Sequence, residues 1–206
     1  MAASKSRYLK RLHPVLVQEL GAQRAGSIIA RAQTILKQLC AENADEPMAM
    51  HMHTRARIYP AIAAFQAMLQ EGVERNAAAD ILNAYYVKQS EAAGAAIRAI
   101  LRIPGLYRRV PRFFARMTRK SFGEAAGFKA KWIRADQDEM RFDMMVCPYQ
   151  DICVRYGCPE IVQGFCRADD VSYGNMHPKL RWDRTKTLGL EGDCCDFQIT
   201  IRKQHR

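Results

Sequence analysis

The sequence predicts an α+β protein in which a helical N-terminal two thirds packs on a small antiparallel β-sheet formed by the C-terminal third. Three observations support this. Over 1–125, alanine is abundant and apolar residues recur at three- and four-residue spacing, which is typical of helices. Over 126–206, apolar residues alternate with polar ones, which is typical of strands. Hydrophobic residues make up 49% of the 206, enough for a sizeable core and too many for wholesale disorder. We therefore expect one α+β domain spanning 1–206.

The helical part is predicted to hold four helical segments. Their expected ranges are 14–40 (one or two helices), 52–71, 76–103 and 106–122. Pro47 separates the first two segments and Gly72 closes the second. Pro111 must either start or kink the last, shorter and basic helix, because proline has no N–H to donate inside a helix.

The C-terminal part is predicted to contain strands and two short helices. Period-two alternation favours strands at 128–136 and 139–147, and later at 179–187 and 195–203. In the second of these, one face carries an apolar row of Met140, Phe142, Met144 and Val146. Pro148 and Pro159 each suit a first helical turn, and the two helices are expected to end near Gly157 and Asp170. This Cys-rich, sheet-containing part is also where we expect the functional site.

The positive charge is concentrated in one segment. The formal net charge is +11, but residues 1–135 carry 22 basic and 9 acidic side chains, whereas 136–206 carry 10 basic and 12 acidic ones. Residues 98–134 alone hold 11 basic side chains and one acid, Glu124. The charge is therefore a local feature of the chain and says little about chemistry in the C-terminal part.

Three interpretations of the basic segment 98–134 compete. The simplest is an amphipathic helix whose apolar face packs on the sheet while its basic face is solvated. The second is peripheral contact with an anionic membrane, for which a basic amphipathic helix is suited. The third is nucleic acid, attracted by phosphate charge. No helix-turn-helix, zinc-finger or RNA-binding motif accompanies the charge, so no specific nucleic-acid partner is expected.

The compartment is expected to be the cytoplasm. The N-terminal residues contain no apolar run long enough for a signal-peptide core, and no stretch approaches the roughly 20 apolar residues of a membrane span. Seven cysteines cannot all pair within one chain, so we expect reduced thiols rather than a disulfide framework. The sequence leaves the oligomeric state open, and a homo-oligomer is one possibility.

Six of the seven cysteines lie between Cys147 and Cys195, which raises the question of zinc. The spacing argues against it, because structural zinc ligands usually come as two close pairs separated by two to four residues. Only Cys153 and Cys158 have such a gap, and His177 is the only histidine nearby. No metal site and no cofactor are predicted, while metal-dependent chemistry would be tested by elemental analysis.

Three cysteines stand where strands or helices begin or end. Cys147 closes a predicted strand, Cys166 precedes Asp169 and Asp170, and Cys195 opens the last strand. Free cysteine is often just a small core residue, and that interpretation suits Cys40 and Cys153. A thiol near carboxylates has a raised pKa, so activating one here would need a cation or base such as Arg184 or His177.

The segment 142–199 contains a strand that ends in Cys147, the Cys166–Asp169–Asp170 cluster, the Arg184-Thr185-x-Thr187 run and the Gly192…Cys195-Asp196-Phe197 ending. With these features, the segment resembles the C-terminal signature of the L-2-amino-thiazoline-4-carboxylic acid hydrolase family. The upstream helical half, with Arg55, Arg57 and Tyr59, is compatible with the family but less specific.

The resemblance implies hydrolytic opening of a small heterocycle to an N-carbamoyl amino acid. Carbon C2 of such a ring is bonded to sulfur and nitrogen, and its hydrolysis needs a nucleophile, a proton donor and a group that holds the ring carboxylate. Candidate residues for these roles are Cys147, Cys166 or Cys195 as nucleophile, Asp169 or Asp170 as acid or base, and Arg184, Thr185 and Asp196 for substrate binding. On a regular strand, Thr185 and Thr187 would face away from Arg184.

Structural interpretations of the same residues remain open. Asp169 and Asp170 suit a helix end, Arg184 and Asp196 suit a cross-strand ion pair, and Asp196 suits a hydrogen bond to a turn. At the level of the whole protein, the alternative to an enzyme is a non-catalytic small-molecule sensor or carrier with an α+β pocket. The two differ in whether a candidate heterocycle is consumed or only stabilises the protein thermally.

Overall fold

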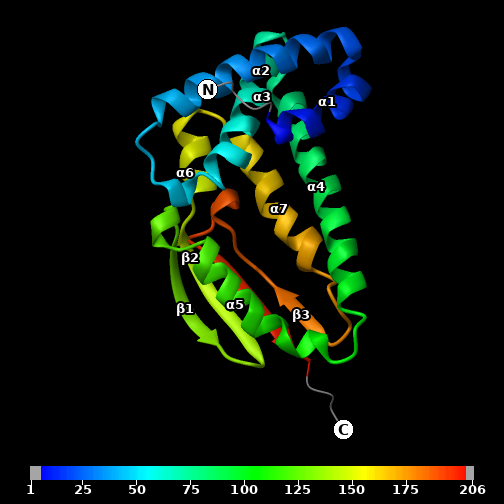
Figure 1. Cartoon of the computed structure of the whole chain (residues 1–206), viewed down its shortest axis with the longest axis vertical. Coiled ribbons are helices and arrows are strands. Elements are labelled where there is room, and N and C mark those ends of the chain that lie inside the picture. The colour runs from blue at the N-terminus through cyan, green and yellow to red at the C-terminus, as the bar shows by residue number, and fades with distance from the viewer. Residues whose placement is uncertain (1–5, 203–206) are drawn as a thin grey trace. The chain divides into compact units, whose positions relative to one another are not determined.

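The computed structural model describes residues 6–202, and it confirms the predicted α+β class (Figure 1). Within that range, helices precede a four-stranded antiparallel sheet built from the C-terminal third. The contacts group into two units. Unit 1 comprises the chain up to Tyr85 together with Tyr149–Gly164, and unit 2 comprises Tyr86–Pro148 together with the chain from Phe165. The expected single domain over 1–206 stays a prediction.

Unit 1 is helical. Its elements are α1 (Arg7–Leu20), α2 (Ala22–Glu42), α3 (Tyr59–Gln70), the first part of α4 (Arg75–Ile100) and most of α6 (Pro148–Arg155). The segment predicted at 14–40 is two helices, which meet at Gly21 with a φ of 82° that favours glycine. Helix α1 begins earlier than predicted, because the Ser6 side chain accepts a hydrogen bond from the Leu9 N–H and caps it.

The second predicted helix, 52–71, consists of two parts. A π-helical turn over Thr54–Ile58 leads directly into α3. The helical spacing of apolar residues in this segment predicts a stripe of Ile58, Ile62, Phe65 and Leu69. The first three are buried, as predicted, and Leu69 is half-buried. This stripe provides much of the core of unit 1.

Unit 2 holds the sheet, in the order β1 (Lys129–Ala135), β2 (Glu139–Val146), β4 (Cys195–Ile201), β3 (Leu180–Asp183). Helix α5 (Val110–Ser121) packs on the sheet (Figure 1), and Pro111 lies in its first turn, as predicted for a helix start. Helix α7 (Val162–Tyr173) packs beside the second half of α4, where Gly94 leaves room for the Val171 and Ser172 carbonyls.

The apolar row on β2 explains why the sheet takes this register. Met140, Phe142 and Met144 are buried as predicted, whereas Val146, at the strand end, is exposed. The Phe142 ring lies 5.0 Å from the ring of Phe197, its partner on β4. Such cross-strand aromatic contacts hold the centre of the sheet together.

Two boundaries differ from the prediction, and both matter for the site. The strand expected at 179–187 ends at Asp183, so the alternation of side chains stops before Arg184. Helix α7 runs to Tyr173, which places Asp169 and Asp170 inside the helix and not at its end. The last strand ends at Ile201, and position 203 of the predicted strand lies outside the described residues.

No helix in the described part of the chain combines the length and apolar character that crossing a bilayer requires.

Candidate functional site

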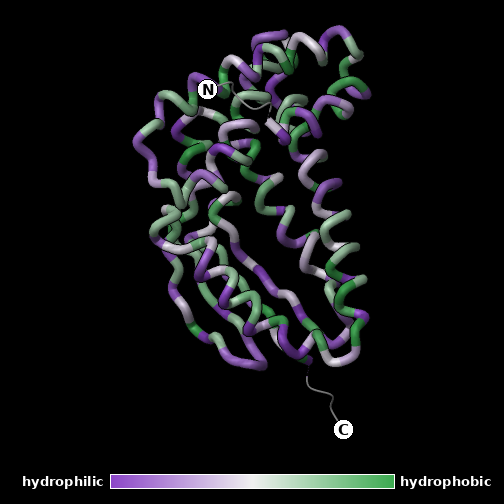
Figure 2. The backbone as a smooth tube through the Cα atoms, in the orientation of Figure 1, coloured by the Kyte–Doolittle hydropathy of each residue, from purple (hydrophilic) through white to green (hydrophobic). Residues whose placement is uncertain are grey.

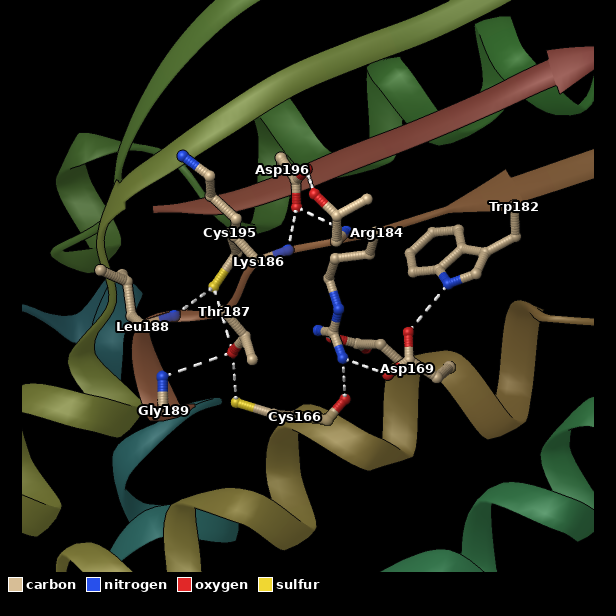
Figure 3. Close-up of polar contacts among 12 residues, drawn as sticks. Cys166, Asp169, Trp182, Arg184, Lys186, Thr187, Leu188, Gly189, Cys195 and Asp196 are labelled. Carbon is tan, nitrogen blue, oxygen red and sulfur yellow. Dashed lines mark hydrogen bonds and ion pairs between the residues drawn. The ribbon is translucent and has the colours of Figure 1, made fainter. Parts of the chain in front are cut away.

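A polar network in unit 2 connects α7 with the segment that follows β3 (Figure 3). Cys166, Asp169 and Asp170 stand at positions i, i+3 and i+4 of α7, and this spacing puts their side chains on one side of the helix. Because β3 ends at Asp183, the chain from Arg184 onward is free to turn its side chains toward that side of the helix.

Arg184 connects the two segments. Its side chain is only 4% exposed, and Nη2 donates to the Cys166 carbonyl oxygen at 2.7 Å and to the Asp170 carboxylate. Nη1 lies 3.6 Å from Asp169 Oδ2. Trp182 Nε1 donates to the other Asp170 oxygen at 3.0 Å. Both oxygens of Asp170 are therefore engaged in holding the loop on the helix.

Thr187 joins two of the three candidate cysteines. Its Oγ1 donates to Cys166 Sγ at 3.0 Å, and Cys195 Sγ donates to the same oxygen at 3.6 Å (Figure 3). Two backbone groups complete the network: the Leu188 N–H donates to Cys195 Sγ and the Gly189 N–H donates to Thr187 Oγ1, both at 3.3 Å.

The Thr187 hydroxyl has a defined direction in this network. A hydroxyl has one hydrogen and two lone pairs. Cys195 and the Gly189 N–H occupy the lone pairs, so the hydrogen of Thr187 points at Cys166. A donor aimed at a sulfur favours the thiolate over the thiol, which makes Cys166 the acceptor end of the chain of hydrogen bonds.

The electrostatics around Cys166 have opposing contributions. Burial raises the pKa of its thiol above the ordinary value, with smaller increases from Cys195 and Asp169, while the Thr187 hydrogen bond and the Arg184 charge act in the lowering direction. For Arg184, burial disfavours the guanidinium charge, but Asp169 and Asp170 outweigh burial and raise its pKa. At neutral pH the site therefore holds the Arg184 cation next to Cys166 in its protonated, uncharged form.

Thr185 and Asp196 form a neighbouring pair of their own. Asp196 Oδ1 accepts from the Thr185 N–H at 2.9 Å and the Lys186 N–H at 2.6 Å, and Oδ2 accepts from Thr185 Oγ1 at 2.6 Å. Burial pushes the Asp196 pKa upward, but these hydrogen bonds outweigh burial and lower it. The hydrogen bond between Asp196 and a turn is confirmed, whereas the cross-strand pair between Asp196 and Arg184 is wrong, because Arg184 turns toward α7.

The structure therefore brings five of the eight predicted site residues into one network, and these are Cys166, Asp169, Asp170, Arg184 and Cys195 (Figure 3). Cys147 is half-buried and lies between β2 and α6. His177, considered as an activating base, instead stacks on Tyr107 with ring centroids 4.7 Å apart.

Thr187, in the network, and Lys186, beside it in the chain, were not among the predicted site residues. Thr187 belongs to the run that carried the family resemblance, but assuming a regular strand put it on the face opposite Arg184. Lys186 is exposed and pairs with Asp193 at 2.9 Å, which raises the lysine pKa. Its position next to Thr187 was visible in the sequence, but nothing local marked it as part of a site.

The cysteines do not gather into one cluster. All seven are free thiols, and Cys153 and Cys158 are buried in unit 1, where Cys158 Sγ donates to the Cys153 carbonyl oxygen at 3.4 Å. Within residues 6–202, no three His, Cys, Asp or Glu side chains are grouped so that they could hold a metal ion.

Comparison with known proteins gives one match. The model of a family described as L-2-amino-thiazoline-4-carboxylic acid hydrolase matches residues 51–199, which is more than half of the chain and includes the whole network around Thr187. No curated protein and no solved structure matches the chain.

Proposed function

The chain belongs to the L-2-amino-thiazoline-4-carboxylic acid hydrolase family, and from that premise we propose that it opens the ring of such a thiazoline, or of a closely similar cyclic amidine, to give an N-carbamoyl amino acid. The observation that carries the proposal is the Thr187 hydroxyl directed at Cys166 Sγ, one helical turn from the Asp169 carboxylate. A nucleophile, a group that orients it and an acid lie together, which is the arrangement that covalent hydrolysis requires.

We assign the attack on ring carbon C2 to Cys166. Cys195 is buried, whereas Cys166 is half-buried and accepts the Thr187 hydrogen bond. In the first step, the Cys166 thiol passes its proton to the Asp169 carboxylate and Sγ forms a bond to C2. The C2–ring sulfur bond then breaks, and the departing sulfur takes that proton from Asp169 and becomes a thiol. The product of this step is an isothiourea that links Cys166 to the two nitrogens of the former ring.

Water completes the reaction. It adds to the same carbon, the C2–Sγ bond breaks, and Cys166 leaves as a thiolate. The carbon becomes the carbonyl of a carbamoyl group that keeps both nitrogens, so one water is consumed overall and no oxidant or reductant is needed.

We assign proton transfer to Asp169. Its side chain is 39% exposed, within reach of substrate and water, and lies 3.6 Å from Arg184. Both oxygens of Asp170 are engaged by Arg184 and Trp182, which suits a residue that holds the loop on α7. Asp169 can therefore protonate the departing sulfur and then take a proton from the attacking water.

Lys186 is better placed than Arg184 to bind the substrate carboxylate. The Arg184 guanidinium is buried and already binds two carboxylates, whereas the Lys186 side chain is 53% exposed. Exchange of Asp193 for the substrate carboxylate would cost little, because both members of the present ion pair are solvated.

Turnover of L-2-amino-thiazoline-4-carboxylate, followed as release of a new thiol, tests the proposal. Cys166→Ser should lower kcat/KM by at least about 10³-fold, because removal of a nucleophile removes the covalent route. Cys147→Ser and Cys195→Ser should lose much less, and Cys40→Ser, in unit 1, is the matched control.

Full activity in all three of the Cys147, Cys166 and Cys195 variants would overturn the covalent mechanism. Thermal stabilisation by the thiazoline with no thiol released from the native protein would instead support a non-catalytic sensor or carrier.

A further inference from the structure

We propose that unit 2 docks on an anionic lipid bilayer through one corner of its surface. This corner surface comprises the end of α4, the turn after it and the outer face of α5. It is defined by Ile100, Arg102, Ile103, Arg109, Arg112, Phe113 and Arg116, all of them exposed. The inference is independent of the proposed reaction, since it uses none of the residues of the Thr187 network.

The charge of the corner surface is uncompensated. Residues 98–123 contain eight lysines and arginines and no acid. Two exposed arginines elsewhere in unit 2 have acidic partners: Arg134 pairs with Asp136 and Glu139, and Arg181 pairs with Asp183. Within the described residues, no arginine of the corner surface forms an ion pair. Such a run of basic side chains attracts the negative surface potential of an anionic leaflet.

Apolar side chains stand among these arginines. Ile100 and Ile103 are each 58% exposed, and Phe113 is 60% exposed. The face of α5 that packs inward uses other residues, namely Val110, Ala115 and Thr118. Figure 2 shows hydrophobic and hydrophilic residues interspersed along α5. Apolar residues that recur every three or four positions among polar ones are the pattern of an amphipathic helix. The core of unit 2 therefore does not account for these three side chains.

A bilayer fits this combination better than nucleic acid does. Phosphate charge would attract the arginines equally, but the bases of a nucleic acid stack on aromatic side chains, and two of the three exposed apolar residues are isoleucines. Isoleucine next to arginine suits the boundary between headgroups and acyl chains, where the apolar part is buried and the cation stays at the phosphates.

A cavity at the edge of the corner surface offers room for a headgroup phosphate. Its volume is about 690 Å³, and its lining includes Arg98, Arg102, Arg202 and His177. Three guanidinium groups around one cavity suit an anionic oxygen group, because arginine donates from a planar fork that matches phosphate. Arg102 belongs both to this cavity and to the corner surface.

Co-sedimentation of the full chain with lipid vesicles tests the proposal. We expect binding to vesicles of phosphatidylcholine with about 30% phosphatidylserine and none to phosphatidylcholine alone, with weaker binding as salt rises. The double variant Arg102→Gln/Arg109→Gln should weaken binding about 30-fold, since each cation near the surface contributes roughly a factor of five. The control is Lys10→Gln/Lys37→Gln, which removes the same charge from exposed positions of unit 1 and should bind like the native chain.

A second pair of variants separates lipid from other polyanions. Ile103→Ser/Phe113→Ser keeps every charge and should weaken vesicle binding about tenfold or more, because the apolar contribution to partitioning is lost. The proposal would be overturned if this variant bound vesicles like the native chain, or if the native chain did not sediment with anionic vesicles at low salt. It would also be overturned if Lys10→Gln/Lys37→Gln weakened vesicle binding as much as Arg102→Gln/Arg109→Gln. Tighter binding to single-stranded RNA than to the anionic vesicles would also overturn it.

Discussion

The two units contain the same kinds of polar side chain but differ in which of them is buried. In unit 1, the buried group is a carboxylate: Glu46 is 8% exposed and accepts from Thr54 Oγ1 at 2.8 Å, Tyr59 OH at 2.9 Å and Arg55 Nε at 3.1 Å. In unit 2, the buried group is the cation Arg184, and its partners Asp169 and Asp170 are 39% and 47% exposed.

This difference separates a structural cluster from a candidate site. Glu46 ties the π-helical turn Thr54–Ile58 to the start of α3, and its oxygens are shielded from water. Around Arg184 the carboxylates face solvent while the cation fixes them in place, so a substrate and a water molecule can reach them. Cys40 lies close enough to Arg55 and Glu46 for their charges to act on its pKa, whereas Cys166 accepts a hydrogen bond from the Thr187 hydroxyl.

The largest expected effect is on the stability of unit 1. Glu46→Ala leaves Thr54, Arg55 and Tyr59 without their shared acceptor and should lower the free energy of unfolding by about 3 kcal/mol. Urea denaturation measures this, and turnover per folded molecule should stay near the native value. A large loss of turnover in a variant of native stability would mean that unit 1 takes part in the reaction.

The same experiment in unit 2 should have a smaller effect on stability and a larger one on activity. Arg184→Gln removes a buried cation whose two partners are well solvated, so we expect a loss of about 2 kcal/mol, less than for a fully buried pair. Turnover should fall as well, because Asp169 and the Cys166 backbone lose a shared contact. Arg184→Lys should restore little, since an ammonium group cannot reproduce the guanidinium fork. Native turnover in Arg184→Gln would show that the cation does not position the site.

Substitution of Thr187 tests the hydrogen bond from its hydroxyl to Cys166 Sγ. Thr187→Val keeps the side-chain shape but removes the hydroxyl, and should lower kcat/KM about tenfold, equivalent to about 1.4 kcal/mol. Alkylation of Cys166 by iodoacetamide should also shift to higher pH, because the donor that favours the thiolate is gone and burial already raises this pKa. Thr187→Ser retains the hydroxyl and should retain the native alkylation profile. An unchanged profile in the valine variant would contradict the assigned direction of the hydrogen bond.

The smallest effect concerns acid stability. The folded-state pKa of Asp196 lies below its ordinary value, so its contribution to stability is present above that ordinary value and is lost as pH falls through the folded pKa. Asp196→Asn should therefore flatten the acid limb of the stability profile by a few tenths of a kcal/mol, since the group is only partly buried. Thermal unfolding from about pH 6 to pH 2 measures this. An acid limb identical to that of the native chain would show that the pair with Thr185 contributes nothing.

Local signals in the sequence were enough for most of the fold. Apolar residues at helical spacing marked the buried face of α3, and Pro111 and Pro148 marked two helix starts. Alternation along β2 identified the buried side of the sheet through Met140 and Met144. These features depend on residues within one or two turns of each other, so periodicity and turn chemistry carry the information.

The candidate site was identified less completely, for a physical reason. The sequence and the family resemblance were enough to name the types of residue in the site and five of its members, namely Cys166, Asp169, Asp170, Arg184 and Cys195. Their arrangement could not, because it depends on β3 ending at Asp183 and on contacts such as that between Thr187 and Cys166, 21 residues apart. By itself, the sequence determined the α+β class, the helix starts and the kinds of group available for chemistry. Only the tertiary structure decided that Arg184 turns toward α7 and away from Asp196, because burial and long-range hydrogen bonds arise only once the chain is folded.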